Sequence, residues 1–220
     1  QRAEGKYRLM PGIIEALTEV RNPFSILTKG TLILRDLELL EEAAAVTDVS
    51  TALSIGTLDD DAWRNSEPGT PHPRKRMEAV ARLNEAGIPC GVMVAPVLPG
   101  LTGGESQLRD VVSAAVDAGA THVSPILLHL RPGVKEEYMR WLEDAYPDLV
   151  ARYASMYSHS AYAPQAQRDD LSERVGALAA ARREETGRVD APRLQLRRGR
   201  RGEEPPKQAL PPEAEQLRLL

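Results

Sequence analysis

A lysine follows the first predicted strand of this sequence, where it could act on a ligand. The segment Phe24–Thr28 is rich in β-branched and apolar residues, and Lys29 and Gly30 come directly after it. In parallel α/β folds, reactive groups gather at the carboxyl ends of the strands. A desolvated lysine there can form a Schiff base, and a charged one can hold a carboxylate or phosphate. A solvated loop lysine is the plainer alternative.

Small polar residues end the second predicted strand, Val49–Ile55. Alternation along a strand puts Ser54 and Gly56 on one face of the sheet, opposite Leu53 and Ile55. Such residues either leave room for a ligand and offer it a hydroxyl, or simply fill a barrel interior. The acidic run Asp59–Asp61 comes next, and we interpret it as the cap of a helix rather than as a cation site.

A proline- and glycine-rich turn follows the third predicted strand, Val92–Val97. It runs from Pro96 through Leu98 to Gly104 and predicts an exposed backbone that can cradle an adenine or a carboxylate. The turn has neither the lysine spacing of a P-loop nor the dinucleotide-binding fingerprint.

Four further features admit a chemical and a structural interpretation. The proline-stiffened loop 65–73 is a plausible rim over a site, and the basic run Arg74–Arg76 is typical of a solvated helix face. Cys90 begins its strand, which is the wrong end for catalysis, so we predict a small buried hydrophobe. His129 ends the fourth strand, where a lone histidine is more often a structural hydrogen-bonding group than a ligand.

The elements that must position these residues alternate along the chain. The fourth predicted strand is His122–Leu128, and helices are predicted near residues 12–20, 37–45, 74–86 and 107–118. This βα repetition predicts a parallel α/β sheet that amounts to half of an eight-unit barrel, with strand edges that need partners. We divide the chain into a partial barrel over residues 1–130, a helical extension over 131–186 with helices near 136–145 and 149–158, and a disordered tail over 187–220.

Composition narrows the class of protein. The chain has 220 residues, 42% of them hydrophobic, a net charge of −4 and one cysteine. Membrane proteins, fibres and disulfide scaffolds are therefore excluded as classes, and one cysteine cannot by itself hold a zinc ion or an iron–sulfur cluster. No window reaches the roughly 18 apolar residues of a membrane span. A reducing, cytoplasmic location fits best.

Taken together, the ordered motifs over residues 1–158 resemble radical S-adenosylmethionine (radical SAM) proteins related to spore photoproduct lyase. The motifs are Tyr7-Arg8-Leu9, Ile26–Lys29, Arg35-Asp36-Leu37, Leu53–Asp59 and Gly87–Leu101, followed by Arg131–Val134 and Trp141-Leu142. The resemblance implies a partial (β/α)6 TIM-like barrel, of which this chain would supply the last four βα units.

The resemblance also implies the cofactors. This family uses a Cys-x3-Cys-x2-Cys loop to hold a 4Fe-4S cluster that cleaves S-adenosylmethionine, with an electron from a reductant such as flavodoxin or ferredoxin, to a 5′-deoxyadenosyl radical. The present chain lacks that motif, so we expect it upstream of Gln1 and expect the 220 residues alone to be inactive. By resemblance, Lys29 approaches the cofactor carboxylate and Ser54 lies near its methionine or ribose. The same motifs add Thr57, Pro96 and Leu98 to the expected cofactor-binding set, although a proline replaces the usual glycine at position 96.

Two other functions remain open at this stage. A Schiff-base aldolase-like barrel would use Lys29 as its nucleophile. A non-catalytic module would contact nucleic acid through the tail segment Arg193–Arg201, although the net charge of −4 argues against nucleic-acid binding by the folded part. The sequence identifies neither the catalytic residues nor the substrate.

Overall fold

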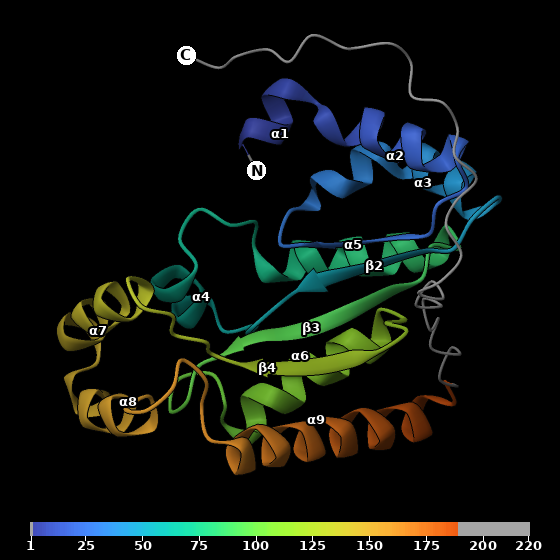
Figure 1. The fold of residues 1–220 in the computed structure, drawn as a ribbon. Helices are drawn as coiled ribbons and strands as arrows, with labels where there is room; N and C mark the ends of the chain where they lie inside the picture. The colour runs from blue at the N-terminus through green and yellow to red at the C-terminus, as the bar shows by residue number, and fades with distance from the viewer. Residues whose placement is uncertain (1, 189–220) are drawn as a thin grey trace, which may run out of the picture.

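The computed structural model describes residues 2–188, and a four-stranded sheet lies at its centre (Figure 1). Its strands are β1 (Phe24–Thr28), β2 (Val49–Ser54), β3 (Cys90–Val97) and β4 (Val123–Leu127). They lie in the order β1-β2-β3-β4, and every neighbouring pair is parallel. The predicted parallel α/β sheet is therefore confirmed, with strand ends within two residues of the expected ones.

Helices connect the strands and extend beyond them. In chain order they are α1 (Arg2–Tyr7), α2 (Leu9–Glu19), the 3₁₀ helix η1 (Thr31–Asp36), α3 (Leu37–Ala44), α4 (Asp60–Ser66), α5 (Pro73–Glu85), α6 (Glu105–Asp117), α7 (Val134–Ala145), the 3₁₀ helix η2 (Pro147–Leu149), α8 (Val150–Met156) and α9 (Gln165–Thr186). The predicted helices correspond to α2, α3, α5, α6, α7 and α8. No bounds were predicted for α1, η1, α4 or α9, although the run Asp59–Asp61 was interpreted as the cap of a helix, which is α4.

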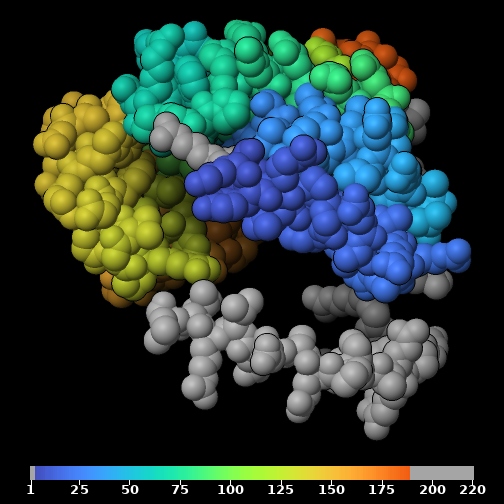
Figure 2. Space-filling view, turned by 90° about the horizontal axis from the view of Figure 1, so that it is seen from above, coloured from blue at the N-terminus to red at the C-terminus, as the bar shows by residue number. Residues whose placement is uncertain are grey.

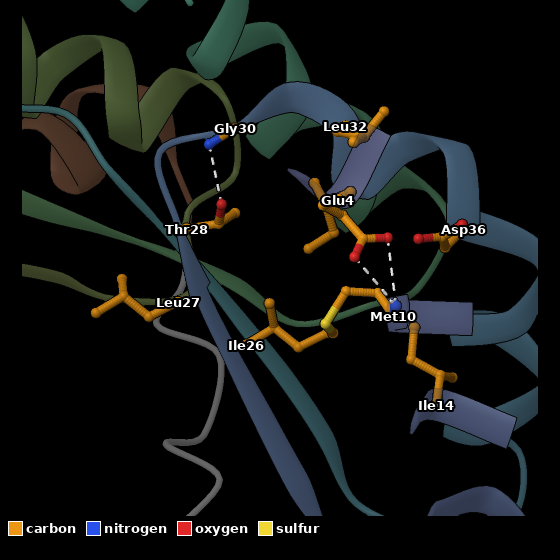
Figure 3. A pocket seen from close by; sticks show the side chains of 10 residues that line it. Glu4, Met10, Ile14, Ile26, Leu27, Thr28, Gly30, Leu32 and Asp36 are labelled. Carbon is orange, nitrogen blue, oxygen red and sulfur yellow. Dashed lines mark hydrogen bonds between the residues drawn. The ribbon is translucent and has the colours of Figure 1, made fainter. Parts of the chain in front are cut away.

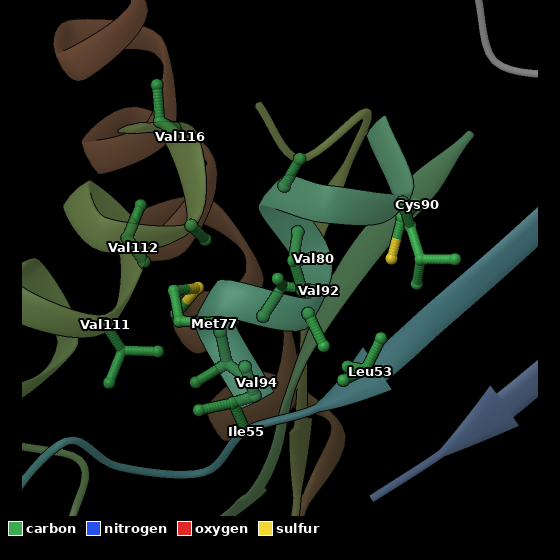
Figure 4. Packing of buried hydrophobic residues seen from close by; sticks show 14 of the residues in the cluster. Leu53, Ile55, Met77, Val80, Cys90, Val92, Val94, Val111, Val112 and Val116 are labelled. Atoms are coloured by element: carbon green, nitrogen blue, oxygen red, sulfur yellow. The ribbon is translucent and has the colours of Figure 1, made fainter. Parts of the chain in front are cut away.

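The main core lies between the sheet and the helices that connect its strands (Figure 4). Leu53 of β2 and Val92 of β3 are fully buried, as are Val80 of α5 and Val112 of α6. Burying one such side chain contributes about 1.5–3 kcal/mol. The helices are thus fixed on this face because they cover a continuous apolar surface.

The opposite face of the sheet is more open. Pairing places Leu27 beside Ala52, and Ser54 beside Met93, so these residues share the face opposite Leu53. Leu27 is 59% exposed. Viewed from above, the molecular surface is hollowed between the blue N-terminal helices and the yellow segment around α7 (Figure 2). A ligand at the carboxyl ends of the strands would therefore approach from this more open face.

The C-terminal helices form a second, smaller core. Helices α7 and α8 lie beyond the carboxyl end of the sheet (Figure 1), around the buried side chains of Leu142, Tyr153 and Tyr157. Helix α9 packs against α6 and β4. The expected division at residues 130 and 186 stays a prediction, and the tail predicted for 187–220 lies outside the described residues from 189 onward.

None of the helices described over residues 2–188 combines the length and apolar character needed to cross a membrane.

Candidate functional site

The expected binding residues come from three neighbouring strands and lie at one end of the sheet. Lys29 follows β1, Ser54 ends β2 with Thr57 close behind, and Pro96 and Leu98 stand at the end of β3. Because parallel strands place their carboxyl ends together, the site is built from segments distant in sequence. Whether these five residues bind a cofactor stays a prediction.

Ser54 links the ends of β2 and β3. Its Oγ donates a hydrogen bond to the carbonyl oxygen of Ala95 at 2.7 Å. Two residues on, Gly56 packs so closely that a Cβ there would lie 2.7 Å from the carbonyl oxygen of Pro96. The two strand ends are therefore held together, and the Ser54 oxygen keeps lone pairs that can accept from a ligand.

Thr57 and Leu98 are both buried and largely engaged with their own turns. The Thr57 Oγ1 accepts from the backbone N–H of Asp59 at 3.0 Å, which leaves its hydroxyl proton free to donate. The Leu98 N–H donates to Thr102 Oγ1 at 2.8 Å, and its carbonyl accepts from the N–H groups of Leu101 and Thr102. The backbone N–H of Leu98 is thus not available to an adenine ring.

The acidic run after Thr57 begins a helix, as predicted. Asp59 is the N-cap of α4, and its Oδ1 accepts from the Ala62 N–H at 2.7 Å. Asp60 and Asp61 occupy the first helical turn, where carboxylates interact favourably with the helix dipole. Among residues 2–188, no group of three or more histidines, cysteines or acids is arranged to hold a metal ion.

Lys29 is not a free loop lysine. Its ammonium forms a hydrogen-bonded ion pair with Oε1 of Glu67, which belongs to the loop between α4 and α5. The lysine side chain is 38% exposed, whereas Glu67 is 10% exposed. Sequence reasoning identified this loop as a rim but missed Glu67, because nothing local connects positions 29 and 67.

Arg76 corrects one expectation. We predicted a solvated helix face for the run Arg74–Arg76, and Arg74 and Lys75 are indeed exposed, but the Arg76 side chain is fully buried. Arg76 precedes Ala79, Val80 and Leu83 at spacings of three, four and seven residues, so it lies on the apolar stripe of α5. That spacing was the available signal.

Cys90 and His129 have structural environments. Cys90 is buried at the amino end of β3, and burial raises the pKa of its thiol to about 11. His129 stacks on Tyr162 with ring centroids 3.9 Å apart and an interplanar angle of 14°. The prediction for Cys90 is confirmed, and the His129 ring lies in an aromatic contact.

A cavity of about 230 Å³ lies beside β1, next to the lysine-bearing loop (Figure 3). Thr28 and Gly30 line it on the strand side, and the carboxylates of Glu4 and Asp36 line it opposite. Arg35 donates to both acids at 2.6–2.7 Å. The hydrogen bond that Arg35 donates to Glu4 lowers the pKa of the Glu4 carboxyl. Both acids are thereby paired with the same arginine, so neither carboxylate in the cavity is without an ion-pair partner.

No family model matches the chain. It is 47% identical over 180 residues to the uncharacterized protein Rv2578c of Mycobacterium tuberculosis (strain ATCC 25618 / H37Rv), a match that covers 82% of this chain and 53% of that protein. It is 30% identical over 98 residues to the uncharacterized protein MJ0683 of Methanocaldococcus jannaschii, covering 44% of this chain and 36% of that protein. The chain thus spans about half the length of the M. tuberculosis relative.

The solved structures similar to this chain include two mutants of spore photoproduct lyase. One has a TM-score of 0.51 at 15% sequence identity and covers 83% of this chain and 55% of that chain. The other, with bound AdoMet and dinucleoside spore photoproduct, has a TM-score of 0.50 at 15% identity over the same shares. The chain shares their fold. The resemblance to radical SAM enzymes expected from the sequence is thus supported at the level of architecture.

Proposed function

We propose that the intact protein containing this chain is a radical SAM enzyme related to spore photoproduct lyase, and that these residues bind S-adenosylmethionine. The observation that carries the proposal is the gathering of Lys29, Ser54 and Thr57 at the carboxyl ends of β1 and β2, in a sheet with the fold of spore photoproduct lyase. An ammonium and two hydroxyls are suited to an amino-acid carboxylate and to ribose or amine groups.

The residues of this chain are suited to S-adenosylmethionine but not to the 4Fe-4S cluster. With Cys90 as its one cysteine, and that cysteine buried at the amino end of β3, the chain cannot supply three thiolates to a 4Fe-4S cluster. On this proposal the cluster ligands belong to a part of the protein outside these 220 residues. In the intact protein, the cluster and S-adenosylmethionine would supply hydrogen abstraction by a 5′-deoxyadenosyl radical, driven by a reductant such as flavodoxin or ferredoxin.

In this proposal, the residues of this chain bind and orient S-adenosylmethionine. The Lys29 ammonium has three N–H donors, of which Glu67 engages one, so two remain for a ligand carboxylate. The Ser54 hydroxyl is directed by Ala95 and can accept a hydrogen bond from the ligand, whereas Thr57 can donate one. The ion pair between Lys29 and Glu67 disfavours a Schiff-base aldolase, because a carbonyl substrate would have to displace Glu67 before it could react with the lysine.

The decisive experiment uses the intact protein, reconstituted anaerobically and reduced with dithionite. We expect cleavage of S-adenosylmethionine to methionine and 5′-deoxyadenosine, reduced at least about tenfold by Lys29→Ala, which corresponds to losing about 1.4 kcal/mol of binding or orientation. Lys75→Ala, an exposed lysine of α5, is the matched control and should retain full cleavage. An intact sequence without a three-cysteine motif, or no cleavage by the reconstituted protein, would refute the proposal. Borohydride trapping of a carbonyl compound on Lys29 would favour the aldolase instead.

A further inference from the structure

The Arg76 side chain donates four hydrogen bonds to groups outside its own helix, α5. Although its side chain is fully buried, its Nη1 donates to the Ser54 carbonyl at 2.7 Å and its Nε to the Pro71 carbonyl at 2.9 Å. Its Nη2 donates to Glu67 Oε2 at 2.7 Å and to Thr70 Oγ1 at 3.2 Å. One guanidinium therefore joins α5, the end of β2 and the loop between α4 and α5.

Glu67 connects Arg76 to Lys29. Its Oε2 accepts from Arg76, while its Oε1 pairs with Lys29, so one carboxylate is shared by two cations. Within residues 2–188 neither cation has a second carboxylate at ion-pair distance. The cluster consequently keeps one positive charge in excess. Since Arg76 is fully buried and Lys29 is 38% exposed, that excess is accessible at the Lys29 end.

We infer that Arg76 and Glu67 are positioning residues for an anionic ligand at Lys29, and that Arg76 couples this position to the Ser54 end of β2. The inference rests on the proposed function, in which the anion is the carboxylate of S-adenosylmethionine. A lysine side chain carries about 2 kcal/mol of rotamer entropy, and a fixed partner removes part of that cost before the ligand arrives. Arg76 fixes the partner, because its planar fork holds Glu67 and the strand end at the same time.

A purely structural role predicts a different pattern from a positioning role. If Arg76 only supports the fold, its loss should weaken every ligand of the site equally. If it acts through Lys29, the loss should be confined to ligands that carry the carboxylate. Methylthioadenosine is the suitable comparison, since it keeps the adenosine and sulfur of S-adenosylmethionine but lacks the amino-acid group.

The experiment measures equilibrium binding of both compounds to the reconstituted intact protein. We expect Arg76→Met to weaken binding of S-adenosylmethionine about tenfold, because it removes both the excess charge and the fixed position of Glu67. The dissociation constant of methylthioadenosine should change less than about twofold. Arg76→Lys should recover part of the loss, since it restores the charge without the fork. Arg74→Met, on the exposed face of α5, should leave both ligands unchanged.

Further measurements distinguish a lost position of Lys29 from a loss of folding and from a failure of the proposed function. Glu67→Gln leaves the buried arginine in place and has a single acceptor oxygen, so it cannot serve both cations. Because Glu67→Gln also raises the excess positive charge, charge alone would strengthen binding of S-adenosylmethionine. We expect the lost position of Lys29 to outweigh that gain, so that binding of S-adenosylmethionine is selectively weakened, with no effect in a Lys29→Ala background. The ¹⁵Nζ signal of Lys29 should shift in both Arg76→Met and Glu67→Gln even without ligand.

Each failure has its own signature. A wild-type protein that binds neither compound refutes the proposed function, while the Lys29 signal still tests the positioning. Equal weakening of both ligands, an effect that survives Lys29→Ala, or an unshifted Lys29 signal overturns the inference.

Discussion

Nη1 of the Arg76 guanidinium donates a hydrogen bond to the carbonyl oxygen of Ser54 at 2.7 Å, so a buried charge on α5 is joined directly to the last residue of β2. A buried cation is unfavourable unless it is paired and hydrogen-bonded. Arg76 meets this condition through Glu67 and through two backbone carbonyls. The same bonds hold the loop that carries Glu67 over the strand ends, which makes the packing of α5 a determinant of the site.

The first prediction concerns the stability that this network contributes. Arg76→Met leaves Glu67 with Lys29 as its remaining ion-pair partner and removes the donor that Arg76 gives to the carbonyls of Ser54 and Pro71. We therefore expect a loss of about 2–4 kcal/mol in the free energy of unfolding. Arg74→Met, two residues earlier on the exposed face, should change it by less than about 0.5 kcal/mol. Urea denaturation of the two variants makes the comparison, and equal stabilities would contradict the prediction.

The sheet could be predicted from the sequence because each strand carries its own signal. The run Phe24–Thr28 was predicted to the residue, since β-branched residues and the preceding Asn22-Pro23 define it locally. Helix α9 was not singled out. Its buried residues Leu171, Val175 and Ala179 recur every four positions in an otherwise polar helix, a stripe too narrow to stand out before α6 and β4 are in place.

The candidate site could be predicted in part. The places of Lys29 and Ser54 followed from the rule that parallel strands present their carboxyl ends together. Their partners did not follow, because the pairing of Lys29 with Glu67 spans 38 positions and depends on how the loop after α4 folds back. The charge of Arg76 also suggested exposure, whereas its helical spacing indicated burial, and the spacing was the correct guide.

A second prediction tests the contact between the ends of β2 and β3. A Cβ at position 56 would lie 2.7 Å from the Pro96 carbonyl oxygen, which is backbone and cannot swing aside. Gly56→Ala should therefore destabilise the protein by about 1–3 kcal/mol. Gly176→Ala is the matched control, because position 176 is exposed within α9 with nothing within 4 Å of its Cβ, and it should stabilise by about 0.5–1 kcal/mol. Thermal denaturation would show opposite shifts, and shifts of one sign would contradict this account.

A third prediction concerns the anchor between the C-terminal helices and the sheet. The buried Tyr157 hydroxyl donates to the Leu128 carbonyl just past β4 at 2.6 Å, and burial raises the pKa of this tyrosine. Tyr157→Phe keeps the ring but leaves the carbonyl without that donor, which should cost about 1–2 kcal/mol. Tyr7→Phe, at an exposed ring, should be neutral. An equally small change in both variants, measured by urea unfolding, would show that the hydroxyl does not anchor α8.

The last prediction follows from the buried thiol of Cys90. Burial raises its pKa from 9.0 to about 11 in the folded protein, so the fold favours the neutral thiol. The corresponding stability is fully present below pH 9 and is lost as the pH rises toward 11, because the unfolded chain ionises first.

Relative to a Cys90→Ala variant, the wild-type protein should therefore lose about 1 kcal/mol of unfolding free energy between pH 8 and pH 10. Urea titrations of both proteins at the two pH values measure the difference, and the variant corrects for every other group that titrates in this range. The same burial predicts that the native thiol resists Ellman's reagent at pH 8 and reacts fully in denaturant. A pH-independent difference between the two proteins, or rapid reaction of the native thiol, would mean that Cys90 is accessible to water and that the amino end of β3 opens readily.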